Sequence, residues 1–173
     1  MLGTTHQIGG VCSAVVLGTF LFPAPLPLVS IVYGGAMIAG ASFGSLLPDI
    51  DHPKSKISKK AQTPAKLLSF AVGHRGWTHT LLVFFFISAL LFWTVNQIGT
   101  ATVLLNYLVF GFSIGYASHL LLDALTVSGI PVFKPFSEHS FRLAKLRTGV
   151  DDPGVQFILI AMTIGVVYLQ YFN

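Results

Sequence analysis

Charged residues are scarce in this sequence. Only 9% of its 173 residues are charged, whereas 53% are hydrophobic. A soluble domain usually has about a quarter of its residues charged. The low charge, together with a mean hydropathy of +0.75, therefore excludes an ordinary soluble domain and predicts a membrane protein.

Cysteine is nearly absent as well. The single cysteine, Cys12, lies inside an apolar stretch. One cysteine excludes both an intrachain disulfide and a cysteine-based zinc motif. We therefore interpret Cys12 as a small apolar residue of the protein interior.

Long hydrophobic runs, by contrast, fill most of the chain. Each approaches the roughly 17–25 residues that a helix needs to cross a bilayer. They cover residues 7–22, 28–47, 80–98, 101–122 and 155–172. The pattern predicts an all-α fold, a polytopic membrane bundle of about five transmembrane helices in a single domain over residues 1–173. The first run lacks a positively charged start, so we interpret it as a retained span and not a signal peptide.

Basic residues are confined to two connecting segments. Residues 48–79 and 123–154 contain all ten lysines and arginines. With five spans both segments lie on one side, which the positive-inside rule makes cytoplasmic, with the N-terminus inside. We expect a multi-pass protein of the cell inner membrane that contacts anionic lipid headgroups. Nucleic acid is not expected as a partner, although the net charge is +4, because the basic residues border apolar spans.

Three local patterns add detail to this topology. Residues 63–72 have Thr63 and Pro64 at their start, which favours a short helix in the membrane interface. Asp151 and Asp152 precede the last span and indicate a helix start. Small residues also recur at four-residue spacing, which favours close packing of helices in lipid. They are Ala36, Gly40 and Gly44 on the second span and Gly111 and Gly115 on the fourth.

Histidines and aspartates gather at the cytoplasmic ends of four predicted spans. His6 precedes the first span. The other members follow the second span, precede the third, or lie on the last turns of the fourth: Asp49, Asp51, His52, His74, His79, His119 and Asp123. Because all lie at one depth, we expect them to meet in a single pocket.

A divalent metal ion is the simplest partner for such a pocket. An ionisable group buried near hydrocarbon costs several kcal/mol unless it is paired, and imidazole and carboxylate are ordinary ligands of zinc. His119 and Asp123 are four residues apart and so share one helix face. Taken singly, each element has another interpretation: His6 as a surface residue, Asp49 as a turn cap, or His119 and Asp123 as a simple hydrogen-bonded pair. Glu138 and His139 lie on the same side, but we place them outside the site.

Four strings carry a resemblance to a known family. LLPDIDHPKS, GHRGWTHTLL, GYASHLLLDALTVSGIPVFKPF and a histidine near the N-terminus resemble the YdjM-like family, LexA-regulated inner-membrane proteins described as metal-dependent hydrolases. More distantly, the order of histidines and aspartates is similar to zinc-dependent phospholipase C and the single-strand-specific nucleases. That likeness implies these metal ligands: His6, Asp49 or Asp51, His74, His79, His119 and Asp123. The sequence departs from their pattern, since it lacks an N-terminal Trp and a second His-x3-acid helix.

These observations together predict a metal-dependent hydrolase. A metal-activated water would attack a phosphoester or another ester of a lipid-like substrate at the cytoplasmic headgroup level. Asp49 or Asp51 would orient that water and accept its proton, and Arg75 would bind a phosphate. Zinc is the expected metal, with manganese as the alternative, in one or more ions. Two other functions stay open: a metal-stabilised scaffold or regulatory protein without turnover, and an ion transporter. A transporter should place polar groups at the midplane or on both sides.

Overall fold

The described part of the chain is helical. The computed structural model describes residues 1–22, 28–51, 77–99, 102–137 and 139–172. Its elements are α1 (Gly3–Leu21), α2 (Leu28–Gly44), the 3-10 helix η1 (Pro48–Asp51), α5 (Leu81–Asn96), α6 (Thr102–Ala124) and α7 (Asp152–Phe172). Among these residues, β-pairing is limited to two isolated bridges. The prediction of an all-α fold is therefore confirmed for the described residues.

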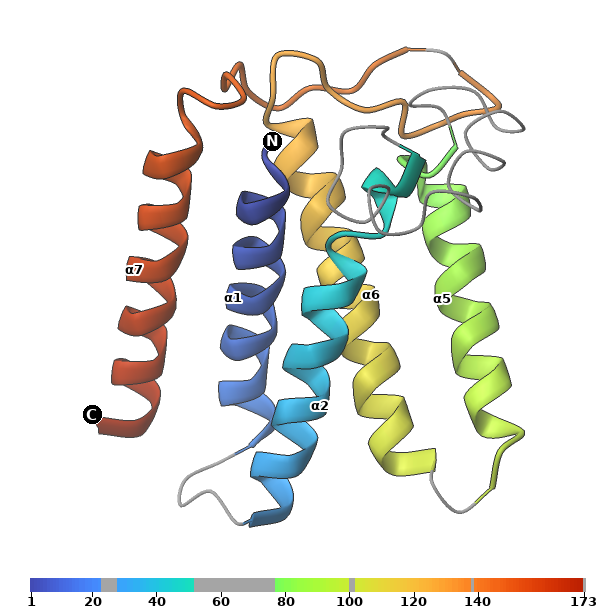
Figure 1. Cartoon of the computed structure of the whole chain (residues 1–173), viewed down its shortest axis with the longest axis vertical. Helices are drawn as coiled ribbons and strands as arrows, with labels where there is room; N and C mark the ends of the chain where they lie inside the picture. The colour runs from blue at the N-terminus through green and yellow to red at the C-terminus, as the bar shows by residue number, and fades with distance from the viewer. Residues whose placement is uncertain (23–27, 52–76, 100–101, 138, 173) are drawn as a thin grey trace.

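The helices form a row with a crossed pair at its centre (Figure 1). α7 flanks α1, the pair α2 and α6 crosses in the middle, and α5 packs on the other side against α6. One end of the bundle contains the start of α1, the 3-10 helix η1 and the end of α6. We call it the loop end. The segment 125–151 runs across this end, and the C-terminus lies at the opposite end.

The central pair packs through glycine. α2 and α6 form the most extensive helix–helix interface among the described residues. A Cβ added at Gly40 would overlap the carbonyl oxygen of Leu108, and one at Gly111 would overlap that of Met37. Only glycine lets the two backbones approach so closely. The predicted role of the small residues is thus seen in the packing of Gly40, Gly44, Gly111 and Gly115.

A buried polar network ties the first turn of α1 to the start of α7. Asp152, with a relative exposure of 1%, accepts hydrogen bonds from the backbone N–H of Leu2 at 2.9 Å and of Gly149 at 2.5 Å. Its carboxylate also accepts from the hydroxyl of Thr5. Gln156 donates to that hydroxyl oxygen at 2.7 Å. The acidic helix start predicted at residue 152 therefore also fixes the position of α1.

The segment after α6 closes the loop end. Leu143 donates a backbone hydrogen bond to Ala124 at 2.7 Å, and Leu81, at the start of α5, donates to Val132 at 3.2 Å. Ile130 and Val132 are buried in one apolar cluster with Tyr116, Leu120 and other α6 residues. The segment thus holds the ends of α5 and α6 together over the polar residues beneath it.

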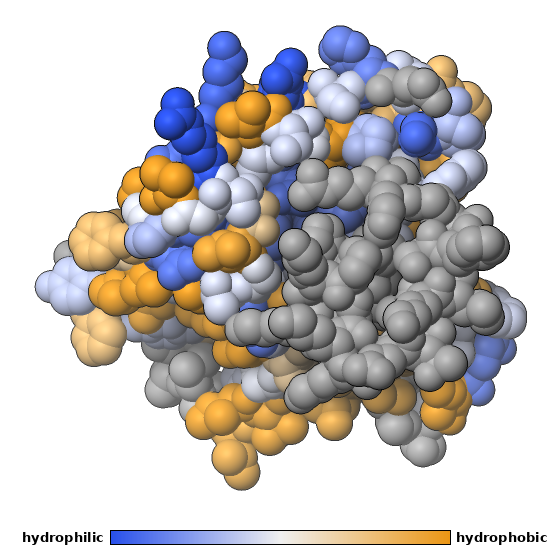
Figure 2. Space-filling model, turned by 45° about the horizontal axis from the view of Figure 1, so that its top comes forward, coloured by the Kyte–Doolittle hydropathy of each residue, from blue (hydrophilic) through white to orange (hydrophobic). Residues whose placement is uncertain are grey.

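In the part of the chain that the structure describes, two helices are long and apolar enough to cross a membrane by length and composition. They are α6, over Val103–Ala124, and α7. α2 and α5 are apolar but shorter, with 17 and 16 residues, so the prediction of five spans stays a prediction, as does the side on which the N-terminus lies. Large apolar side chains such as Phe85, Trp93 and Phe157 are exposed on the flanks, where lipid would cover them. Figure 2 shows hydrophilic side chains gathered at the loop end, with some hydrophobic ones among them and more below.

Helix boundaries differ in places from those expected. α1 begins at Gly3 rather than at residue 7, so His6 lies inside the helix and is fully buried. The interpretation of His6 as a surface residue was therefore wrong, because the turn of α1 that contains it packs under the loop end. Asp49 lies on the 3-10 helix η1, just after the second predicted span. The predicted interfacial helix at 63–72 lies outside the described residues.

Candidate metal centre

The last two turns of α6 provide the base of the site. His119 and Asp123 are one helical turn apart, and His119 Nε2 lies 3.5 Å from Asp123 Oδ2. His119 is fully buried, and its Nδ1 lies 2.7 Å from the carbonyl oxygen of Ser45, just after α2. A carbonyl oxygen can only accept, so Nδ1 donates this hydrogen bond. In the neutral ring, Nε2 therefore carries a lone pair, which faces the cluster and can accept a hydrogen bond or bind a metal.

His79 approaches from the other side. It precedes α5, whose first turn is capped by Thr80: the side chain of Thr80 accepts a hydrogen bond from the N–H of Val83 at 3.2 Å. This cap fixes the path by which the chain enters the helix. His79 is 4% exposed, its Nδ1 lies 3.1 Å from Thr78 Oγ1, and its Nε2 lies 3.3 Å from His119 Nε2. Two imidazole nitrogens thus face each other inside the protein.

Asp49 completes a group of four. From η1, its Oδ1 lies 3.8 Å from His79 Nε2 and 3.9 Å from His119 Nε2. His79 Nε2 also lies 3.4 Å from Asp123 Oδ2. One ligand atom from each of Asp49, His79, His119 and Asp123 lies within 4.8 Å of the other three.

The spacing of these atoms suits a metal ion. Ligand atoms about 2.0–2.2 Å from a tetrahedral zinc are about 3.3–3.6 Å apart. His79, His119 and Asp123 are spaced at 3.3, 3.4 and 3.5 Å, and Asp49 lies slightly further out. The donor set, two imidazole nitrogens and two carboxylates, is one that divalent metals accept. The cluster could therefore hold a metal ion, which would also satisfy the lone pair of His119.

The hydrogen bond to Ser45 is typical of a supported metal ligand. A histidine that binds a metal usually donates its other ring N–H to a carbonyl or carboxylate, which fixes the tautomer and the ring orientation. Sequence reasoning did not identify Ser45, because the contact is made by a backbone carbonyl oxygen and no residue type encodes it. Its position follows from the close α2–α6 packing, which brings the end of α2 beside His119.

His6 adds a second imidazole next to His119. The two rings are stacked, with centroids 3.7 Å apart and planes 17° from parallel. His6 Nε2 lies 3.2 Å from Asp123 Oδ1, yet neither ring nitrogen makes a hydrogen bond with good geometry among the described residues. The amino group of Met1 also contacts Asp123 Oδ1, at 2.6 Å. Asp123 thus contacts three histidines, His6, His79 and His119.

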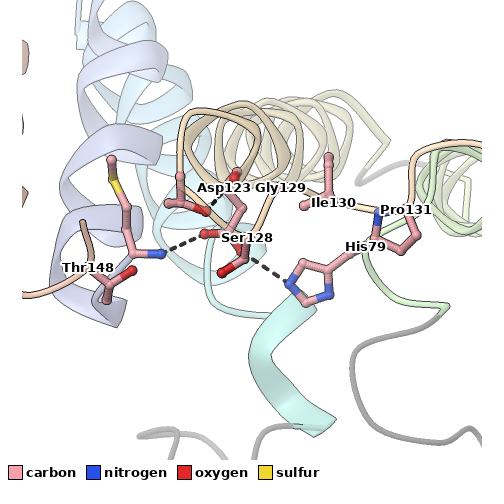
Figure 3. Close-up of a pocket in the computed structure, with 9 residues that line it drawn as sticks. His79, Asp123, Ser128, Gly129, Ile130, Pro131 and Thr148 are labelled. Carbon is pink, nitrogen blue, oxygen red and sulfur yellow. Dashed lines mark hydrogen bonds and ion pairs between the residues drawn. The ribbon is translucent and has the colours of Figure 1, made fainter. Parts of the chain in front are cut away.

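A small pocket connects the site to the loop end (Figure 3). It is lined in part by His79, Asp123, Ser128 and Thr148, and Figure 3 shows His79 and Asp123 facing each other in it. The cavity volume is about 40 Å³, enough for a few water molecules. Water can therefore reach the side chains that would bind a metal.

Several predicted site residues lie outside the described residues. These are the side chain of Asp51 and all of His52, His74 and Arg75; Glu138, which we placed outside the site, also lies outside the described residues. Their predicted roles stay predictions. His139 is described and exposed, away from the cluster of four. The structure thus brings together His6, Asp49, His79, His119 and Asp123 from four separate parts of the sequence.

Comparisons with known proteins agree with the resemblance carried by the four strings. A family model described as YdjM inner membrane protein matches residues 1–172. The chain is 32% identical to the uncharacterized protein YvsG of Bacillus subtilis over 99% of its length and 95% of the relative's. It is 33% identical to the inner membrane protein YdjM of Escherichia coli over 78% of its length and 67% of that protein. No solved structure matches. The chain belongs to the YdjM inner membrane protein family.

Proposed function

We propose that this protein is a membrane-embedded, metal-dependent hydrolase. Its substrate would be a phosphoester or another ester of a lipid-like molecule, presented at the level of the headgroups on the cytoplasmic side of the inner membrane. The observation that carries the proposal is the set of four ligand atoms from Asp49, His79, His119 and Asp123 within 4.8 Å of one another. No serine or cysteine nucleophile is needed in such a site.

The residues divide into ligands and a proton acceptor. His79, His119 and Asp123 are the closest three and the least exposed, and they would hold the ion. The ion, most simply zinc, supplies the Lewis acidity that activates water and polarises the ester. Three protein ligands leave a fourth position open, as in catalytic and not structural zinc sites.

Asp49 is the residue that would accept the proton of the attacking water. Its carboxylate lies further from both histidines than Asp123 does, at 3.8 and 3.9 Å, and has the highest side-chain exposure of the four, 24%. From the edge of the site it would orient an incoming water and accept its proton. Arg75, which lies outside the described residues, keeps its predicted role of binding the phosphate.

The position of the site supports an amphiphilic substrate. The cluster lies at the loop end, next to the hydrophilic surface of Figure 2 and above flanks of exposed apolar side chains. An ester with a long apolar tail can place its head at this level while its tail stays in lipid. A soluble substrate would gain nothing from a bundle with apolar flanks.

Detergent-purified protein provides the test. We expect elemental analysis to find zinc or manganese, and chelator to abolish hydrolysis of bis-(p-nitrophenyl) phosphate, a short p-nitrophenyl ester or phospholipid in mixed micelles. Protein that binds neither metal, with hydrolysis insensitive to chelator, contradicts the proposal.

One variant separates an enzyme from a metal-stabilised scaffold. Asp49→Asn should retain the metal and the thermal stability of the wild type but lower turnover by about 100-fold or more, because the proton acceptor is lost. The matched control is Asp151→Asn, which changes an acid near the start of α7 and should keep full turnover. Metal-loaded wild type without measurable turnover on any of these substrates favours the scaffold.

A further inference from the structure

His6 is a buried histidine that the four-residue site does not use. It is fully buried, it comes from the first turns of α1, and neither of its ring nitrogens has a hydrogen-bond partner among the described residues. A buried polar nitrogen without a partner costs about 1–3 kcal/mol. Proteins rarely leave such atoms unpaired unless a ligand or an ion satisfies them.

The ring of His6 lies beside the second carboxylate oxygen of Asp123, which the amino group of Met1 also contacts. Oδ2 of Asp123 faces His79 and His119, at 3.4 and 3.5 Å. Oδ1 faces the opposite way, 3.2 Å from His6 Nε2 and 2.6 Å from the amino group of Met1. One carboxylate therefore presents each of its oxygens to a different set of nitrogens.

The rings of His6 and His119 are stacked, and each lies beside a different oxygen of Asp123. The centroids of His6 and His119 are 3.7 Å apart and the rings are nearly parallel. In two-metal sites, ions bridged by a shared ligand are about 3.5–4 Å apart. The spacing of the two parallel imidazoles, each beside one oxygen of the same carboxylate, is thus comparable with the spacing of a pair of bridged ions.

We propose that the site binds two divalent cations bridged by Asp123. The first position is formed by His79, His119 and Oδ2 of Asp123, with Asp49 at its edge. The second is formed by His6 and Oδ1 of Asp123, and water from the pocket beside Met1 and Asp123 completes its coordination. The proposal rests on the metal centre of the proposed function but not on hydrolysis, so it can be tested without a substrate.

A second ion changes what the site can do with a phosphoester. A pair of ions at this spacing supports both the attacking and the leaving oxygen of an in-line displacement. A single ion is sufficient for a carboxylic ester. A two-metal centre therefore suits the phosphoester substrate named in the proposed function.

Metal stoichiometry and electron paramagnetic resonance test the proposal. Metal-free protein in detergent is titrated with Mn²⁺ alone. We expect the wild type to bind two ions per chain, with an exchange-coupled spectrum in place of the sextet of an isolated Mn²⁺ ion. His6→Ala should bind one ion per chain and show the uncoupled sextet. His139→Ala, an equal change at an exposed histidine outside the site, should bind two coupled ions.

The outcomes separate this proposal from the proposed function. Wild type that saturates at one uncoupled ion overturns the two-metal centre but leaves a one-metal hydrolase intact. Wild type that binds no ion overturns both. The wild-type spectrum decides the question even where His6→Ala does not fold, and a His6→Ala protein that keeps two coupled ions also overturns the role of His6.

Discussion

α6 and α7 are both long and apolar enough to span a membrane, yet they occupy different places in the bundle. In the most apolar part of α6, 44% of the residues are buried, whereas in the corresponding part of α7 none are. α6 lies at the centre and carries His119 and Asp123. α7 lies on the flank, where its first turn is tied to α1 through Asp152. Hydropathy thus identifies candidate spans but does not decide which helix is central.

Glycine packing explains why α6 is buried and α7 is not. Gly111 and Gly115 of α6 touch the backbone of α2, and neither position has room for a Cβ. Gly154 and Gly165 of α7 have nothing within 4 Å of where a Cβ would be. The glycines of α6 are therefore needed for close helix packing, whereas those of α7 make no packing contact. The difference also matters for function, because α2–α6 contact brings Ser45 and η1 beside His119.

Exchanging glycine for alanine in both helices tests this comparison most strongly. Gly111→Ala should lower the free energy of unfolding by about 3 kcal/mol or more, since its Cβ meets the Met37 carbonyl and the helices must separate. Gly165→Ala is the control and should stay within about 1 kcal/mol of wild type. Thermal or denaturant unfolding in detergent measures both. Equal effects at the two glycines would show that α2 and α6 are not in backbone contact.

Removing a ligand from α6 should affect metal binding more than folding. His119→Ala should weaken zinc binding by about 100-fold or more, because it removes a ligand atom and leaves Asp123 facing one fewer partner. His139→Ala should bind zinc as the wild type does. Competition titration with a zinc-sensitive dye gives the affinities. Unchanged affinity in His119→Ala would mean that the ion, if bound, lies elsewhere.

The start of α7 allows a smaller and more local test. Asp152→Ala removes the acceptor of three hydrogen bonds, from Leu2, Thr5 and Gly149. It should cost about 2 kcal/mol of stability, because three donors lose their partner and one of them, the Thr5 hydroxyl, is fully buried. Asp151→Ala removes one exposed acceptor, of the Arg147 N–H, and should cost about 0.5 kcal/mol or less. Thermal unfolding decides between them, and a reversed order would contradict the burial of Asp152.

Much of the architecture could be predicted from sequence because it depends on local properties. Hydropathy runs predicted the helices, and four-residue spacing predicted both the glycine contact and the shared face of His119 and Asp123. The gathering of ionisable residues at one depth indicated where a site would lie. The sequence left two interpretations of His6 open, a surface residue or a metal ligand, because its burial depends on where α1 begins and on the anchoring of its first turn by Asp152.

The sequence by itself determined that this chain forms apolar helices and that its histidines and aspartates lie at their ends, since both follow from the order of residues along one chain. Only the tertiary structure decided which of these side chains meet. The reach of a side chain is a few ångströms, so the meeting of Asp49, His79, His119 and Asp123 depends on the approach of helices far apart in sequence. The glycine contact between α2 and α6 sets one part of that approach, and the segment 125–151, tied to α5 and α6, sets another.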